Sequence, residues 1–326
     1  MRSLLDHRLI IVTGKGGVGK TTVACAVAEA ARQAGRRVLL AETASVESAA
    51  ARFESDPAPL GYQGRTLKPR LHALRIDPHE ALADYVRLQT GLGLVTDRLL
   101  ATEAFRQLLE AAPGWRELII LGKIWHLEQK TDERGRPEYD LIVVDAPATG
   151  HGLTFLDVPR VVQSAVRSGP LMRHAGWVEA MVHDRERTLL LPVTLPEELP
   201  VRETLELVER ARNEIDIGVD RVIVNRMPRQ PRDGLAQSLA ALPDDLALEA
   251  LPEVPALREL VRHAQARSDL ATKERAHVAK GCALPVVDLP ARANGMDAAS
   301  RWTEEADAVL AEPRWLDDTS PAASAS

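Results

Sequence analysis

Short apolar runs alternate with longer helix-type patterns along most of the chain. The runs are rich in Val, Ile and Leu, and most of them end at Gly or an acidic residue, which is typical of buried strands. They lie at residues 9–13, 37–41, 71–76, 141–144, 189–193, 220–225 and 284–289. Because helix patterns such as 23–34 and 256–271 separate them, the sequence predicts an α/β fold with a mostly parallel, doubly wound sheet of about seven strands.

Two regions carry helix patterns without a strand between them. Residues 79–131 therefore form a predicted helical insertion, and residues 157–187 add further helices, whereas 55–70 is predicted as a loop. The middle helix of the insertion is apolar on more than one face, through Trp115, Leu118, Ile119, Ile120, Leu121, Ile124, Trp125 and Leu127. Packing in the core is the favoured interpretation of this face, and a surface for a client or partner is the alternative. The apolar residues of 171–182, which include Met172, Trp177 and Met181, leave the same two alternatives open.

The first strand is followed by the sequence GKGGVGKTT, from Gly14 to Thr22, and then by a helix pattern. This order and spacing fit GxxxxGK[ST], the loop whose backbone N–H groups surround the phosphates of a nucleotide. Lys20 is expected to reach the β and γ phosphates and Thr21 to bind Mg²⁺. The predicted nucleotide-binding residues of the loop are Gly14, Lys15, Gly16, Gly17, Val18, Gly19, Lys20, Thr21 and Thr22.

An acidic residue completes the predicted magnesium site. Asp145 follows the apolar strand 141–144 directly, which places a carboxylate beside the metal and its waters in nucleotide-binding sheets of this kind. The chain then continues as a loop, so that residues 145–151 read DAPATGH.

Two features give this chain a specific resemblance. Lys15 directly follows the first glycine of the phosphate-binding loop, and DAPATGH is similar to the DTAPTGH motif of the ArsA-like ATPases, which drive arsenite pumps or target tail-anchored proteins. The resemblance implies a P-loop ATPase that forms a dimer around two Mg·ATP, with Lys15 contacting the nucleotide of the partner. It also implies that Gly150 lies near the γ-phosphate and that His151 links nucleotide state to the helical region.

The resemblance extends to the adenine site. Asn225, at the end of the strand 220–225, matches the family's adenine-binding asparagine, whose amide can donate to N7 and accept from N6. A further strand-like run at 246–251 precedes Pro252, which matches the proline that lies against the base. The segment PExLxxxET, from Pro196 to Thr204, also matches the family.

The chain also departs from the family. Where the family has the aspartate that orients the attacking water, this sequence has Ala44, with Glu42 two residues earlier. Either Glu42 orders the water or Mg²⁺, or it is an ordinary residue at a strand end and hydrolysis is slow. The two cysteines, Cys25 and Cys282, form neither a CxxC zinc motif nor the clustered thiolates that arsenite needs.

Charge and length limit the remaining possibilities. The net charge of −6 argues against a nonspecific nucleic-acid binder, and no apolar run reaches membrane-spanning length. We therefore expect a cytoplasmic protein with one ATPase domain at residues 1–316 and a disordered tail at 317–326. The expected function is an ATP-hydrolysing, dimeric switch for a protein or hydrophobic client, with Lys15, Lys20, Glu42 and Asp145 as catalytic residues. The alternative is a regulatory subunit that binds ATP beside a paralogous catalytic chain.

Overall fold

A single sheet of eight strands organises the described part of the chain. The computed structural model describes residues 3–44, 46–54, 57–90, 102, 114–147, 149–165, 168–228, 238, 241, 254–291 and 307–310. The strands are β1 (Leu9–Thr13), β2 (Val38–Glu42), β3 (Arg65–Lys68), β4 (Leu71–Arg75), β5 (Leu141–Asp145), β6 (Thr188–Thr194), β7 (Val222–Met227) and β8 (Val286–Pro290). Their order is β3-β4-β2-β5-β1-β6-β7-β8, and every pair except β3 and β4 is parallel. The predicted doubly wound α/β fold is confirmed.

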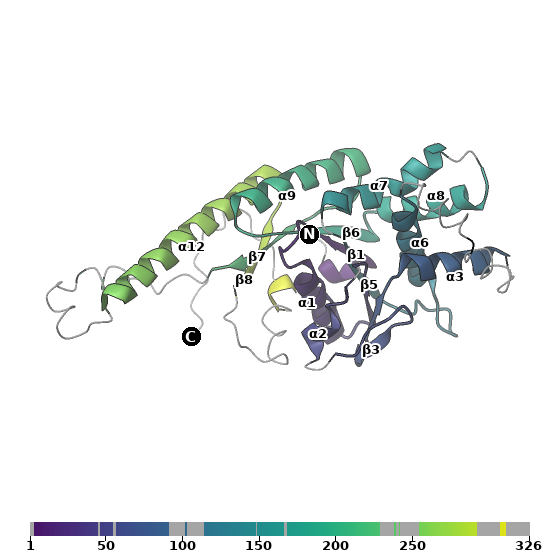
Figure 1. Cartoon of the computed structure of the whole chain (residues 1–326), viewed down its shortest axis with the longest axis horizontal. Coiled ribbons are helices and arrows are strands. Elements are labelled where there is room, and N and C mark those ends of the chain that lie inside the picture. The colour runs from purple at the N-terminus through teal and green to yellow at the C-terminus, as the bar shows by residue number, and fades with distance from the viewer. Residues whose placement is uncertain are drawn as a thin grey trace.

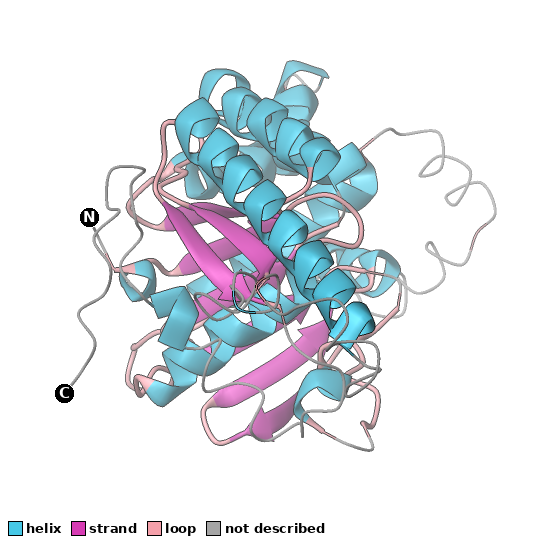
Figure 2. Ribbon diagram, turned by 90° about the vertical axis from the view of Figure 1, so that its left-hand side faces the viewer, coloured by secondary structure: helices cyan, strands magenta, loops and turns pink. Residues whose placement is uncertain are grey.

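Helices cover the sheet and extend beyond it at both ends (Figure 1). The regular helices of the described residues are α1 (Lys20–Gln33), α2 (Ala50–Phe53), α3 (Pro78–Thr90), α6 (Trp115–Gln129), α7 (Thr149–Ala165), α8 (Pro170–His183), α9 (Glu198–Arg210) and α12 (Val254–Cys282). At one end α3, α6, α7 and α8 gather into a helical region, and at the other α12 projects past the sheet. Figure 2 shows helices on both sides of the strands.

The edge strand β3 corrects the prediction for 55–70, which was a loop. Arg65–Lys68 is polar and only half-buried, so it lacks the apolar signal of the other strands. It forms because it pairs antiparallel with β4 through a tight turn at Pro69 and Arg70. The helix α12 is also longer than its predicted extent of 256–271. The predicted strand 246–251, Pro252, the tail 317–326 and most of 91–113 lie outside the described residues.

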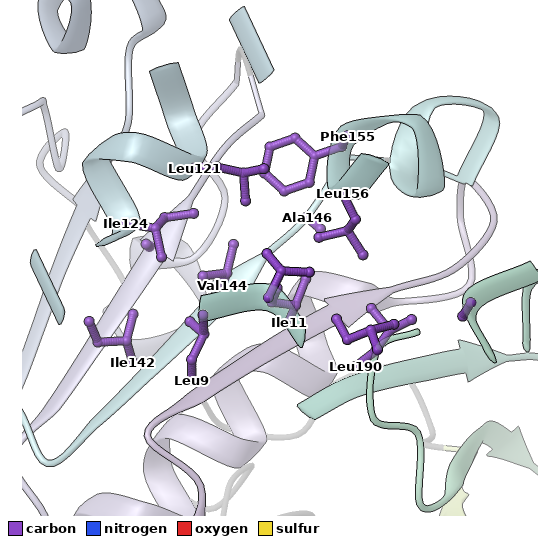
Figure 3. Packing of buried hydrophobic residues seen from close by; sticks show 14 of the residues in the cluster. Leu9, Ile11, Leu121, Ile124, Ile142, Val144, Ala146, Phe155, Leu156 and Leu190 are labelled. Atoms are coloured by element: carbon purple, nitrogen blue, oxygen red, sulfur yellow. The ribbon is translucent and has the colours of Figure 1, made fainter. Parts of the chain in front are cut away.

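Alternating side chains of the strands build a core on each face of the sheet. Leu9 and Ile11 of β1 point to one side, where α6 and α7 pack, while Ile10 and Val12 point to the other side, against α1. Both sets are fully buried, which explains why β1 is a continuous apolar run rather than an alternating one. Figure 3 shows the first of these cores, in which Leu121 and Ile124 of α6 and Phe155 of α7 close over β1 and β5.

Core packing of the insertion's middle helix is confirmed. Six apolar residues of α6 are buried: Leu118, Ile119, Ile120, Leu121, Ile124 and Leu127. Helix α8 differs, since Ala175, Val178, Met181 and Val182 are buried while Trp177 is 47% exposed.

Among the described residues, no helix is both long and apolar enough to cross a membrane.

A buried carboxylate joins the helical region to the sheet. Glu128, at the end of α6, accepts hydrogen bonds from Arg8 Nε at 2.7 Å and from both Nε and Nη2 of Arg187. Arg8 precedes β1 and Arg187 precedes β6, so one side chain fixes the start of two neighbouring central strands. Burial by itself raises the pKa of Glu128, but the hydrogen bonds and charges of Arg187 and Arg8 outweigh it and lower the pKa below its usual value.

Candidate functional site

The phosphate-binding loop lies at the carboxyl edge of the sheet, between β1 and α1. Strand β1 has β5 on one side and β6 on the other, so the chain turns in opposite directions from this point. Crevices at such positions are where open α/β sheets bind their ligands. Helix α1 begins at Lys20 and directs its N-terminal N–H groups towards the loop, which favours anionic phosphate.

Two glycines of the loop lie close to neighbouring strands, Gly14 against backbone and Gly19 against a side chain. Gly14 has φ +149°, and a Cβ placed there would lie 2.2 Å from the carbonyl oxygen of Val193 in β6. Gly19 has φ +94°, and its Cβ would lie 2.3 Å from Nδ2 of Asn225 in β7. The loop therefore fits against β6 only when position 14 lacks a side chain, and a Cβ at position 19 would have to displace the amide of Asn225.

Lys20, Thr21 and Asp145 converge below the loop. Thr21 Oγ1 donates a 2.5 Å hydrogen bond to Asp145 Oδ2, and Lys20 Nζ donates to the backbone oxygen of Lys15 at 3.2 Å. Burial lowers the pKa of Lys20, and the charge of Asp145 opposes that shift. Asp145 itself has a raised pKa because it is buried, although Thr21 and Lys20 counteract the burial.

Glu42 lies directly beside Asp145, because the two residues are paired in the register of β2 and β5. Glu42 is fully buried, and its Oε1 accepts hydrogen bonds from Ser48 N, Ser48 Oγ and Ala49 N. The side chain thus orders the loop after β2. Burial raises the pKa of Glu42, with the charge of Asp145 adding to the shift and the loop hydrogen bonds opposing it.

Three buried oxygens at this edge have no hydrogen-bond partner among the described residues. They are Thr13 Oγ1, Glu42 Oε2 and Asp145 Oδ1, at the ends of β1, β2 and β5. Two neighbouring buried carboxylates with raised pKa values are stabilised by a cation, and oxygen donors of this kind suit Mg²⁺. No group of three or more His, Cys, Asp or Glu within the described ranges is placed to hold a metal by itself. The donor set therefore fits Mg²⁺ that takes its other ligands from phosphate and water.

Asn225 lies against the phosphate-binding loop. Its Nδ2 donates to the backbone oxygen of Val18 at 2.8 Å, and its Oδ1 accepts from the backbone N–H of Arg226. Each of these groups retains one further hydrogen-bonding capacity, so a contact with adenine stays a prediction. The first role that the structure gives Asn225 is to support the loop.

Lys15 contacts a distant part of its own chain. Its Nζ lies 2.7 Å from Oε1 of Glu203, in the second turn of α9. Glu203 belongs to the PExLxxxET segment, for which the sequence predicted no partner. The pairing joins two segments 188 residues apart, and no local pattern indicated it.

The other predicted site residues have mixed outcomes. Gly16 and Gly17 lie exposed at the tip of the loop, and Thr22 lies in the first turn of α1. Gly150 and His151 were expected in a loop but belong to the first turn of α7, because the helix starts at Thr149, inside the motif. Their side-chain surroundings, like Pro252, lie outside what the structure describes.

A cavity of about 100 Å³ lies between α3, α6 and α8, away from the phosphate-binding loop. Aromatic residues form much of its wall, with Trp125 and Trp177 stacked at 5.1 Å and His174 edge-on to both rings. His174 has a lowered pKa because it is buried and lies near His126, so it is neutral at pH 7. Helical periodicity indicated Trp125 and Trp177, but the sequence carried no signal for His174.

We expect Gly19→Ala to weaken Mg·ATP binding at least about tenfold, because the new Cβ displaces Asn225 and the loop it supports. Isothermal titration measures this change. Gly135→Ala is the matched control: Gly135 has φ +74° with open space around its Cβ position, so it tests backbone strain without the clash. Equal affinity in wild type and Gly19→Ala would contradict the supporting role of Asn225.

Comparison with known proteins agrees with this geometry. Residues 7–175 match the family model described as the anion-transporting ATPase, ArsA type. The chain is 34% identical over 316 residues to the ATPase BagA of Mycobacterium tuberculosis, with 90% of each chain covered. It is 29% identical to a putative arsenical pump-driving ATPase 2 of Aquifex aeolicus, with 69% of this chain and 82% of that protein covered. It is 26% identical to an ATPase ASNA1 homolog of Entamoeba dispar, with 67% and 76% covered.

The matched segment contains the phosphate-binding loop, Glu42 and Asp145, and the similarity to the mycobacterial protein runs through nearly the whole sheet. Together with the mostly parallel sheet and the site at its carboxyl edge, these matches show that this chain belongs to the ArsA ATPase family.

Proposed function

We propose that this protein binds and hydrolyses Mg·ATP and uses the nucleotide to switch between two states of a dimer. The observation that carries the proposal is the convergence of Lys20, Thr21, Glu42 and Asp145 around unpartnered buried oxygens at the phosphate-binding loop. Family membership implies ATP binding. Hydrolysis, magnesium, the dimer, the client and the cytoplasmic location are our proposals.

Each residue has a distinct proposed role in the nucleotide site. Mg²⁺, when bound, neutralises charge on the β and γ phosphates. Thr21 Oγ and Asp145, which now make a hydrogen bond with each other, would hold the ion. Lys20 leaves the backbone oxygen of Lys15 and donates to phosphate oxygens. The loop N–H groups and the start of α1 bind the remaining phosphate charge.

Glu42 is the proposed residue that orders the attacking water. Its Oε1 already binds the loop after β2, whereas its buried Oε2 has no hydrogen-bond partner among the described residues. A carboxylate fixed on one side and free on the other is suited to orient water near the γ-phosphate. This interpretation assigns to Glu42 the function that the family places at the position of Ala44.

Exposed apolar residues support the proposed dimer interface and the proposed client surface. Val46 and Leu199, in the loop after β2 and at the start of α9, are 74% and 54% exposed at the nucleotide edge, where a partner would cover them. In the helical region, Leu88, Val161 and Trp177 are also exposed, and the aromatic cavity opens beside Trp177. We propose that this second surface binds a protein or hydrophobic client, and that α7 transmits the nucleotide state to it.

The second candidate function is a regulatory subunit that binds ATP beside a paralogous catalytic chain. Ala44 favours it, because the usual water-orienting aspartate is absent. The same dimer then contains one catalytic site, supplied by the partner.

Turnover by the purified chain separates the two candidates. We expect Glu42→Gln to lower kcat at least about 100-fold with little change in ATP affinity, because the amide keeps the oxygen that Ser48 and Ala49 bind but loses the negative charge. ATPase assays and titration calorimetry measure both quantities. Glu47→Gln, in the same loop, is a control for a charge change near the site. Tight ATP binding with no wild-type turnover would reject the self-sufficient ATPase and favour the regulatory subunit.

A further inference from the structure

We infer that Glu203 is a positioning residue that holds Lys15 in its own subunit until ATP closes the dimer. This inference rests on the proposed function, in which Lys15 contacts the nucleotide of the partner. The carrying observation is the 2.7 Å contact between Lys15 Nζ and Glu203 Oε1.

The fold makes this contact possible. Strand β6 neighbours β1, and α9 follows β6, so Glu203 of α9 reaches the phosphate-binding loop of the same chain. Lys15 lies two residues after the end of β1, on the side of the loop that faces α9, while Lys20 is turned inward to the backbone oxygen of Lys15. The two lysines of the loop therefore have separate positions, and Glu203 binds the outer one.

The ion pair is suited to be broken. Lys15 and Glu203 side chains are 30% and 35% exposed, in contrast to Glu128, which is 4% exposed between two arginines. An exposed pair of this kind shifts the equilibrium between the paired and the unpaired side chains by at most about fivefold. The pair can therefore hold Lys15 in most molecules without preventing its release.

Release is required because one ammonium group cannot occupy both places. When Lys15 extends to a phosphate of another subunit, its contact with Glu203 is lost. Closure of a symmetric dimer breaks two such pairs. Together they raise the dimer dissociation constant by up to about 25-fold, the product of two fivefold effects. ATP supplies the negative charge that outcompetes Glu203, whereas the subunit without nucleotide keeps Lys15 folded back.

The experiment compares Glu203→Gln with Glu206→Gln. Glu206 lies in the same helix and is 62% exposed beside Arg202, so the control makes the same charge change in a pair that does not involve the loop. Two quantities are measured with the full chain. One is the acetylation rate of Lys15 without nucleotide, followed by peptide mass spectrometry, and the other is dimer formation with Mg²⁺ and a non-hydrolysable ATP analogue.

We expect Glu203→Gln to increase the acetylation rate of Lys15 up to about fivefold and to lower the dimer dissociation constant up to about 25-fold. High salt should reduce both differences, since it screens the exposed pair. Glu206→Gln should match the wild type. Unchanged acetylation of Lys15 in Glu203→Gln would overturn the inference. Faster acetylation together with weaker dimerisation would also overturn it, because Glu203 would then stabilise the closed dimer. Faster acetylation without any nucleotide-dependent dimer in the wild type would instead overturn the dimer of the proposed function, while the ion pair itself would stand.

Discussion

Replacing Lys20 by alanine is expected to lower kcat/KM for ATP hydrolysis at least about 100-fold, because the variant loses a positive charge that is held against the transferring phosphate. Lys20 is half-buried next to Asp145, and its ammonium bonds only to the backbone oxygen of Lys15 among the hydrogen bonds of the described chain. Steady-state ATPase assays measure the loss, and calorimetry measures how much of it is ATP affinity.

The fold should survive this change, since Lys20 Nζ binds no other side chain in the described structure. Circular dichroism and the thermal midpoint should therefore equal those of the wild type. Lys130→Ala is the control, because Lys130 is 45% exposed and pairs only loosely with Glu138 at 3.6 Å. Turnover in Lys20→Ala within about threefold of wild type would show that this loop is not the site of hydrolysis.

Removing the Glu128 carboxylate is expected to give the largest loss of stability. Glu128→Ala leaves Arg8 and Arg187 without their shared partner, which costs about 3 kcal/mol in the free energy of unfolding. Denaturant titration at pH 7 measures the change. Glu214→Ala removes the exposed partner of Arg210 and should cost less than about 1 kcal/mol. A loss below about 1 kcal/mol in Glu128→Ala would show that the two arginines are equally well satisfied by water.

The pH dependence of this effect has a definite sign. The folded-state pKa of Glu128 is lowered by Arg187 and Arg8, so the folded chain binds a proton less readily than the unfolded chain does. The contribution of Glu128 is therefore complete above the unfolded pKa of about 4.3 and decreases as the pH falls through the lower, folded pKa. The difference in stability between wild type and Glu128→Ala should accordingly narrow in acid below about pH 4.

Local patterns were sufficient to predict the sheet and most of the nucleotide edge. The apolar run before Gly14 and the run before Asp145 located two adjacent central strands. Strand β3 was missed because an exposed edge strand such as Arg65–Lys68 has no apolar face to detect.

Long-range pairings could not be predicted. Neither the contact of Lys15 with Glu203 nor that of Asn225 with Val18 has a sequence pattern, because each depends on which strands become neighbours in the sheet. The same holds for Thr13 and Glu42, whose closeness to Asp145 follows from register across β1, β5 and β2. Spacing along the chain located the motifs, and the strand order decided which of them meet.

Helix α1 is held in place by the core, and it therefore fixes the position of the phosphate-binding loop at its N-terminus. Its residues from Val23 to Ala31 are buried on every face of the helix, and five of them are alanines that allow the sheet to approach closely. A helix enclosed in this way cannot tilt or slide when phosphate arrives without opening the core around it. In the proposed switch, we therefore expect any displacement that accompanies ATP to occur in the loops after β2 and β5, while the phosphate-binding loop keeps its position.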